Sequence, residues 1–225
     1  MKTCLVLGSG SDIAQQIMPA MAQDYHVIGW RRGEDLPRER WDLCLITIGM
    51  VAPVGLWHDV PLDKWLTSID SNLCEPFILL TSVWNTHNPG ATVCFFAGSN
   101  PNMIMSGYCA YNVGKMGLLK LVEQIDHETP DAKFFALNPG IFLTKIHDAT
   151  IESRWDNPKL AAALRGEGKV SSAARVVECL KWAVAQPKEV IGGRNLCVSD
   201  PWDNPTRPRL LREIPDMFKL RRDEG

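Results

Sequence analysis

Short apolar segments alternate with amphipathic helical patterns along most of this 225-residue chain. The apolar runs typical of buried strands cover residues 4–7, 26–30, 43–48, 91–96, 133–137 and 194–198. The first helical pattern begins after Ser11 or Asp12, either of which can cap it. The others cover residues 62–83, with a break near Pro76, 108–125, and 171–185, where Ser171 or Ser172 can be the cap. This alternation predicts an α/β fold built on a doubly wound parallel sheet, the Rossmann-like architecture.

The length fits one domain, because two full domains would need about 100–150 residues each. We expect residues 1–200 to form that domain and residues 201–225 to form a C-terminal tail, which holds four prolines and many charges. Residues 145–170 interrupt the alternation, with one helical piece near 160–164 and glycines at 166 and 168. We predict that this polar segment is a short, mobile substrate lid.

Composition excludes several classes of function. The net charge of −2 carries no electrostatic footprint for duplex nucleic acid or anionic lipid. No apolar run is long enough for a signal peptide or a membrane helix. The seven cysteines lack a C-x-x-C pair and lie mostly in apolar runs, so we expect reduced thiols in a cytoplasmic protein. The five histidines lack metal-ligand spacing, so no metal site is expected.

A glycine-bearing turn, Gly8-Ser-Gly10, joins the first predicted strand to the first predicted helix. Small residues there let the backbone approach a pyrophosphate, and the helix N-terminus supplies N–H donors. Many strand-to-helix turns contain glycine, so this turn alone leaves an ordinary connection open.

Tyr111 and Lys115 are four residues apart in a predicted helix, so they share one face. A nearby ammonium stabilises a phenolate, lowers the pKa of the tyrosine and turns it into a usable proton donor. Taken alone, the pair is also compatible with two surface residues.

Further motifs fall in a fixed order around this pair. Asn72 and Ser99 precede it, Asn138-Pro139-Gly140 and Thr144 follow it, and Ile191-Gly-Gly-Arg-Asn-Leu precedes the last strand residues. From about residue 3 to residue 200 the chain resembles the short-chain dehydrogenase/reductase family, in a compact and divergent single-domain form.

The resemblance implies hydride transfer between a nicotinamide cofactor and a small carbonyl or alcohol. It implies that Tyr111 is the catalytic acid, that Lys115 lowers its pKa and binds the nicotinamide ribose, and that Ser99 hydrogen-bonds the substrate oxygen. Asn72 corresponds to the residue that kinks its helix and orders a relay water. The residues expected to bind the cofactor are Gly8, Ser11, Asp12, Ile13, Arg31, Arg32, Gly49, Tyr111, Lys115, Pro139, Gly140, Phe142 and Thr144.

The chain departs from the family pattern at several positions. Asp12 and Ala14 stand where the family usually has glycine, and a carboxylate near a pyrophosphate is unfavourable unless it turns away or caps the helix. Ile46-Thr-Ile-Gly49 replaces Asn-Asn-Ala-Gly, and Gly114 replaces the common serine. Only about a dozen residues separate the second and third strands, so we expect no helix there and a more open adenine side.

The choice of cofactor follows from the end of the second strand. An acidic residue there would bind a ribose 2′-hydroxyl and favour NAD(H), but the sequence has Trp30, Arg31 and Arg32. Two guanidiniums can grip a 2′-phosphate, so NADP(H) is expected over NAD(H). A solvated basic turn is the alternative, and Trp30 can either stack, on an arginine or on adenine, or pack on the core.

Three functions remain open at this point. The first is an NADP(H)-dependent oxidoreductase that forms a homodimer or homotetramer, as relatives commonly do. The second is a non-catalytic NADP(H)-binding regulatory or scaffold protein. The third is a sugar-nucleotide-modifying enzyme of epimerase or reductase type, linked to surface polysaccharide. Near the substrate mouth, His147 is expected to be solvated, and Trp155 is a candidate for lining the pocket.

Overall fold

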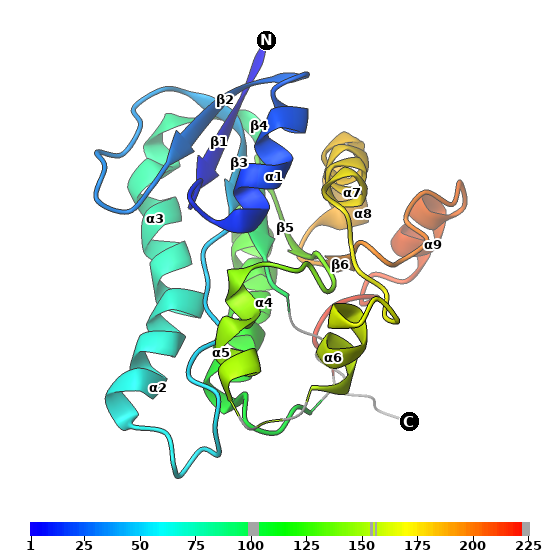
Figure 1. Cartoon of the computed structure of the whole chain (residues 1–225). Helices are drawn as coiled ribbons and strands as arrows, with labels where there is room; N and C mark the ends of the chain where they lie inside the picture. Colours follow the sequence, from blue (N-terminus) through cyan, green and yellow to red (C-terminus); the bar gives the residue numbers. More distant parts are fainter. Residues whose placement is uncertain (99–103, 154, 156, 222–225) are drawn as a thin grey trace.

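A parallel sheet lies between two layers of helices (Figure 1). The structure is a computed structural model that describes residues 1–98, 104–153, 155 and 157–221. Its strands are β1 (Lys2–Leu7), β2 (Tyr25–Trp30), β3 (Trp41–Ile46), β4 (His87–Phe96), β5 (Lys133–Asn138) and β6 (Asn195–Cys197). Its helices are α1 (Asp12–Met21), α2 (Leu62–Ile69), α3 (Glu75–Val83), α4 (Cys109–Glu128), α5 (Asp148–Glu152), α6 (Pro158–Leu164), α7 (Ala173–Ala185), α8 (Lys188–Ile191) and α9 (Arg207–Glu213).

The strand order places a topological switch between β1 and β3. The order is β2-β1-β3-β4-β5-β6, and every neighbouring pair is parallel. Successive connections therefore leave β1 in opposite directions, which confirms the prediction of a doubly wound sheet. In such sheets ligands bind beyond the carboxyl ends of the strands at the switch, so this edge is where a site belongs.

Alternate residues of each strand serve opposite layers of the core. In β1, Cys4 and Val6 pack in the apolar cluster that contains residues of α1 and α7. Leu5 and Leu7 point the other way, into the cluster that contains residues of α3 and α4. Since both faces of the sheet are covered, the strands read as continuous apolar runs instead of alternating ones.

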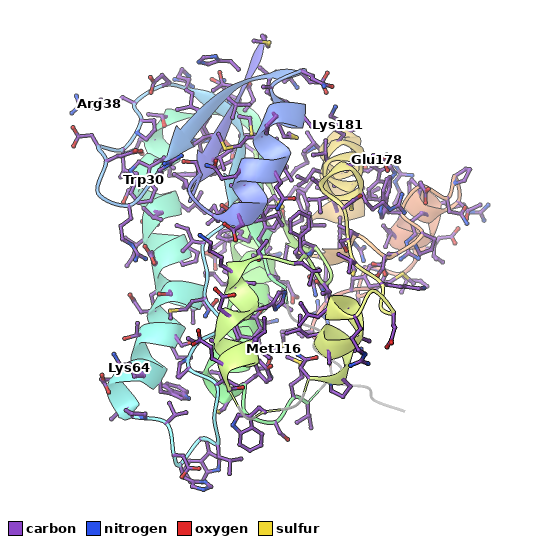
Figure 2. All side chains as sticks on the ribbon, in the orientation of Figure 1. Trp30, Arg38, Lys64, Met116, Glu178 and Lys181 are labelled. Carbon is purple, nitrogen blue, oxygen red and sulfur yellow. The ribbon has the colours of Figure 1, made fainter. Side chains whose placement is uncertain are left out.

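The connection from β2 to β3 contains no helix, as the sequence predicted. Trp30 ends β2, and Arg38 lies on the connection (Figure 2). The Trp30 ring is buried in the core, and its Nε1 donates a hydrogen bond to the Glu34 carbonyl at 3.0 Å. Trp30 therefore packs on the core, which was one of its two predicted roles.

The helix predicted over 62–83 is interrupted, as expected. A π-helical turn, Asp70–Cys74, separates α2 from α3, so the helix is interrupted just before Pro76. Pro76 lies in the first turn of α3, where its missing N–H costs little. The π-turn carries Asn72, and its wider backbone changes the direction in which this side chain points.

The last quarter of the chain is more ordered than its polar composition suggested. Residues 145–170 contain a 3₁₀ turn (Lys145–His147), α5 and α6, where the sequence predicted one helical piece. The tail contains α9 and packs on the sheet domain, because Arg194 is 2% exposed and donates to the carbonyls of Leu211, Ile214 and Met217. No helix in the described part of the chain is long and apolar enough to cross a membrane.

Candidate active site

A continuous cleft runs along the carboxyl ends of the strands, at the switch point. It comprises three adjoining hollows that share Thr47 and Gly49. The inner cavity, about 110 Å³, is lined among others by Ile13, Tyr111, Lys115, Phe142, Thr144 and His147. The middle hollow, about 470 Å³, is lined among others by Ser11, Asp12, Ile13, Thr144 and Lys145. The outer hollow, about 200 Å³, is lined among others by Gly8, Gly10, Trp30, Arg31, Arg32 and Glu75.

The glycine turn sits where the middle and outer hollows meet. Gly8 has φ +92°, and a Cβ there would lie 2.7 Å from the Ile48 side chain, so only glycine fits. Ser11 is the N-cap of α1, since its Oγ accepts a hydrogen bond from the Ala14 amide at 3.3 Å. Among the described residues, the amides of Asp12 and Ile13 have no acceptor. This helix end therefore offers two N–H donors to an anion.

Asp12 does not cap the helix. Its Oδ2 accepts a hydrogen bond from the Lys145 amide at 2.8 Å. The carboxylate therefore faces the beginning of the 145–170 segment, while it still lines the middle hollow. The sequence suggested that an aspartate is tolerated here if it caps the helix or turns away. The structure shows the second arrangement, in which the side chain binds another partner.

Asn72 lies behind the cleft and fixes the loop after β3. Its Nδ2 donates to the carbonyls of Met50 and Ser68 at 2.8 and 2.9 Å, and its Oδ1 accepts from the Met50 amide at 3.2 Å. A Cβ at Gly49 would lie 2.8 Å from Asn72 Oδ1 and 2.9 Å from Lys115 Nζ. Gly49 is thus the point where the cleft wall, Asn72 and Lys115 meet.

Tyr111 and Lys115 project from α4 into the inner cavity. Tyr111 is 6% exposed and Lys115 is 3% exposed, and both line the cavity. The Tyr111 hydroxyl donates to the Gly98 carbonyl at 3.1 Å, and Lys115 Nζ donates to the Phe96 carbonyl at 2.8 Å. The spacing of four residues thus does place both groups on one face, at one end of the cleft.

Burial changes the acidity of both groups. It raises the pKa of the Tyr111 phenol above its usual value, because a phenolate would lose its hydration. It lowers the pKa of the Lys115 ammonium to about 7 for the same reason. The prediction that the Tyr111 pKa is lowered is therefore wrong here, since burial is the dominant cause of its shift.

The structure brings the remaining predicted site residues to the same cleft. Ser99 lies outside the described residues. Gly140 has φ +73°, and a Cβ there would lie 2.5 Å from Ser171 Oγ, which excludes a larger residue. The predicted residues that line the inner cavity beside Tyr111 and Lys115 are Ile13, Gly49, Pro139, Gly140, Phe142 and Thr144.

One residue of the cleft, Glu75, escaped the sequence interpretation. Glu75 lies in the outer hollow and binds Arg32 with both carboxylate oxygens, at 2.7 and 2.6 Å from Nη2. His147, expected near the substrate mouth, is half-buried and lines the inner cavity. Glu75 is 43 residues from its partner, so no local spacing could reveal it. Trp155 packs against Gly107 and does not line the inner cavity.

Within the described residues, no three His, Cys, Asp or Glu side chains gather to hold a metal ion. The hydrogen-bond donors of the cleft include the free amides at the N-terminus of α1, the arginines and the Tyr111–Lys115 pair, while Asp12 and Glu75 contribute carboxylates. This donor set suits an elongated anionic ligand with a reacting group at the inner end.

No family model and no curated protein matches the sequence. Solved structures match in fold. A short-chain dehydrogenase/reductase from Saccharomyces cerevisiae gives a TM-score of 0.74 at 19% identity, covering 89% of this chain and 97% of that chain. A short-chain dehydrogenase family protein from Francisella tularensis gives 0.70 at 12%, covering 88% and 96%. A small-chain dehydrogenase in complex with NADPH gives 0.71 at 15%, covering 87% and 95%. The chain therefore has the Rossmann-like fold of the short-chain dehydrogenase/reductase structures.

Proposed function

We propose that the protein is an oxidoreductase that transfers a hydride between NADP(H) and a small carbonyl or alcohol substrate. The observation that carries this proposal is the continuous cleft, which has arginines at its outer end and the buried Tyr111–Lys115 pair at its inner end. The NADPH complex of a protein with the same fold adds support.

The three hollows fit the parts of a dinucleotide. The glycine turn and the free amides of Asp12 and Ile13 suit the pyrophosphate, because they lie between the outer and inner hollows. The inner cavity, with Pro139, Gly140 and Phe142 on its wall, suits the nicotinamide. The Asp12 carboxylate opposes an anion in the middle hollow, and its hydrogen bond to the Lys145 amide offsets part of that effect.

Within this function the residues divide the chemistry. A bound nicotinamide would supply or accept the hydride. Tyr111 holds the proton on its Oη and donates it to the substrate oxygen during reduction. The phenol is protonated at neutral pH, and its raised pKa makes it a weaker proton donor than a free tyrosine in this structure. Lys115, whose pKa is about 7, is partly protonated at neutral pH, and its Nζ supplies a donor for a ribose hydroxyl.

The preference for NADP(H) rests on Arg31 more than on Arg32. Arg32 is held by Glu75, and this ion pair leaves little net charge for a phosphate. The Arg31 stem packs over Gly10, and its side-chain nitrogens have no partner among the described residues. Arg31 is therefore the guanidinium that we assign to the 2′-phosphate.

The roles of Ser99 and Asn72 complete the proposal. Ser99 is proposed to hydrogen-bond the substrate oxygen, as the family resemblance implies. Asn72 is proposed to order a relay water. The family resemblance also implies that this residue kinks its helix, and the place of Asn72 in the π-turn supports that part of the proposal. The segment 145–170 is proposed to act as a substrate lid.

We also propose a homodimer or homotetramer in the cytoplasm. The outer faces of α2, α3 and α4 carry exposed apolar side chains, namely Leu62, Leu66, Phe77, Ile78 and Val113. Such a face suits a two-fold interface. The cytoplasm is supported by the seven cysteines, all of which are free.

The test replaces one hydroxyl at a time. Tyr111→Phe should keep NADPH affinity, measured by tryptophan fluorescence, while kcat for carbonyl reduction falls by about 100-fold or more. Tyr108→Phe is the matched control, because this buried tyrosine bonds Thr150 and does not line the inner cavity. NADPH binding with no reduction of any carbonyl would favour a regulatory protein. Turnover by Tyr111→Phe at the wild-type rate would contradict the assignment.

A further inference from the structure

His147 is a cavity residue that the proposed hydride transfer does not use. It ends the 3₁₀ turn that follows Thr144, and its side chain lines the inner cavity together with Tyr111 and Lys115. Nothing in the motif set assigns a role to this position. Its imidazole is a titratable and hydrogen-bonding group on the wall of the cavity that we assign to the nicotinamide, beside the Tyr111 hydroxyl that a substrate must approach.

The hydrogen-bond geometry fixes which ring nitrogen carries the proton. His147 Nε2 lies 3.2 Å from the Phe142 carbonyl oxygen, which can only accept, so Nε2 is the donor. Burial lowers the pKa of His147 below 6.5, against a smaller opposing effect of Asp148 and of this hydrogen bond. The ring is therefore neutral at pH 7, and Nδ1 carries a lone pair that can accept a hydrogen bond.

Nδ1 is both unpartnered and accessible. No described residue donates to it. Among the described side chains, the shielded polar atoms without a partner are Arg194 Nε and Asn195 Oδ1, so Nδ1 is not sealed inside the protein. Nδ1 is thus an open hydrogen-bond acceptor on a residue that lines the inner cavity.

The other polar groups of the inner cavity have the opposite hydrogen-bonding character. Apart from threonine hydroxyls, the polar side chains among its described residues are Tyr111 and Lys115, which donate, and His147, which accepts. The remaining wall is largely apolar, with Ile13, Ile48, Val51, Phe96, Phe142 and Ile146. A substrate that matches this wall presents an acceptor to Tyr111, a donor to His147 and little other polarity.

We propose that His147 is a specificity-determining residue whose Nδ1 accepts a hydrogen bond from a substrate hydroxyl. The substrate class is then a small hydroxyketone or hydroxyaldehyde, with the hydroxyl close to the carbonyl that is reduced. In the reverse direction the substrate is the corresponding diol. This inference rests on the proposed hydride transfer and adds the chemistry of the second substrate contact.

Two substitutions at His147 distinguish the role of Nδ1 from the role of Nε2. His147→Gln places an amide nitrogen near the Nε2 position, so it can keep the bond to the Phe142 carbonyl while it loses the Nδ1 acceptor. His147→Asn places a carbonyl oxygen near the Nδ1 position and loses the other bond. Each variant is compared with the wild type on 1-hydroxy-2-butanone and on 2-butanone, with NADPH affinity and thermal midpoint as checks on folding.

We expect the wild type to prefer the hydroxyketone by roughly tenfold or more in kcat/KM, since a site built to bond a hydroxyl rejects the analogue that lacks it. His147→Gln should lose this preference through a higher KM for the hydroxyketone, with 2-butanone little changed. His147→Asn should retain most of it. These three results together support the assignment.

Other outcomes overturn it. A wild type that reduces both ketones equally refutes the inference and leaves hydride transfer intact. If His147→Gln retained the preference for the hydroxyketone and His147→Asn lost it, His147 would have a structural role through its bond to the Phe142 carbonyl. Equal losses on both ketones with weaker NADPH binding would show that His147 contacts the cofactor. If the wild type reduces no carbonyl although it binds NADPH, the proposed function falls, and this inference falls with it.

Discussion

The carboxylate of Asp12 accepts a hydrogen bond from the backbone amide of Lys145 at 2.8 Å. This contact joins the N-terminus of α1 to the start of the proposed lid, across 133 residues of sequence. An aspartate that is unfavourable for an anionic cofactor therefore has a second use, which is to hold the lid segment against the cleft.

Two substitutions at Asp12 separate these effects. Asp12→Asn keeps an acceptor for Lys145 but removes the charge, so NADPH affinity should rise roughly fivefold. Asp12→Ala also removes the acceptor, so hydrogen exchange at residues 145–152 should become faster. Calorimetry and exchange mass spectrometry check the two expectations. Weaker NADPH binding by Asp12→Asn would show that the carboxylate does not oppose the cofactor.

Cofactor preference should depend unequally on the two arginines. Arg31→Ala should weaken NADPH binding by about 1.5–3 kcal/mol and leave NADH binding nearly unchanged. Arg32→Ala should cost less, because Glu75 already pairs with its guanidinium. Glu75→Gln frees Arg32 and should tighten NADPH binding. The measurement is the dissociation constant of each cofactor for each variant, and equal NADPH and NADH affinities in the wild type would refute the preference.

The buried Lys115 should make stability depend on pH. Its pKa is about 7 in the folded protein, below the usual 10.5, so the unfolded chain binds more protons between these values. The free energy of unfolding should therefore rise with pH above 7, by at most about 1.4 kcal/mol per pH unit. Urea unfolding from pH 6.5 to 9 measures this slope relative to Lys115→Met, which should lack it. Identical slopes would show that Lys115 is not shifted.

Gly114 was noted in the sequence as a departure from the common serine, and the structure supplies the reason. A Cβ at Gly114 would lie 2.9 Å from the Asn72 Cβ, so the close approach of α4 to the π-turn requires glycine. The glycine at position 114 and the π-turn that carries Asn72 are therefore linked by this contact. Neither position, taken singly in the sequence, could reveal the link.

Two glycines of α4 should therefore respond differently to alanine. Gly114→Ala should destabilise the fold by about 1–3 kcal/mol, because Asn72 cannot move without losing its bonds to Met50 and Ser68. Gly117→Ala meets the flexible end of Leu73 and gains helix propensity, so its effect should be within about 1 kcal/mol. Equal losses of unfolding free energy, measured by urea titration, would contradict this account.

The exposed apolar face of α2 and α3 predicts self-association. Leu66 is 53% exposed and Ile78 is 56% exposed. Leu66→Lys combined with Ile78→Lys should shift sedimentation at micromolar concentration from a dimer or tetramer toward a monomer. Ile151→Lys is the control, since this exposed apolar residue lies on α5, away from that face. A wild-type monomer would refute the interface.

Local patterns predicted most of the architecture. Apolar runs located the strands because both faces of the sheet are buried, and Tyr111, Lys115 and the Gly8 turn were found because their spacing is set within one helix or one turn. Glu75 was missed because its place depends on a contact with Arg32, 43 residues away. The shift of the Tyr111 pKa was also missed, since burial follows from packing and not from the neighbouring lysine.

The position of Arg194 has a consequence for synthesis of the chain. Its guanidinium leaves the ribosome before Leu211, Ile214 and Met217, whose carbonyls it needs. A buried cation without acceptors is costly, so we expect β6 to stay undocked until α9 and the residues that follow it, up to Met217, have been made. Strands β1 to β5 have no such dependence on the tail and can assemble earlier. Docking of β6 with its arginine paired thus depends on a segment that follows it by about twenty residues.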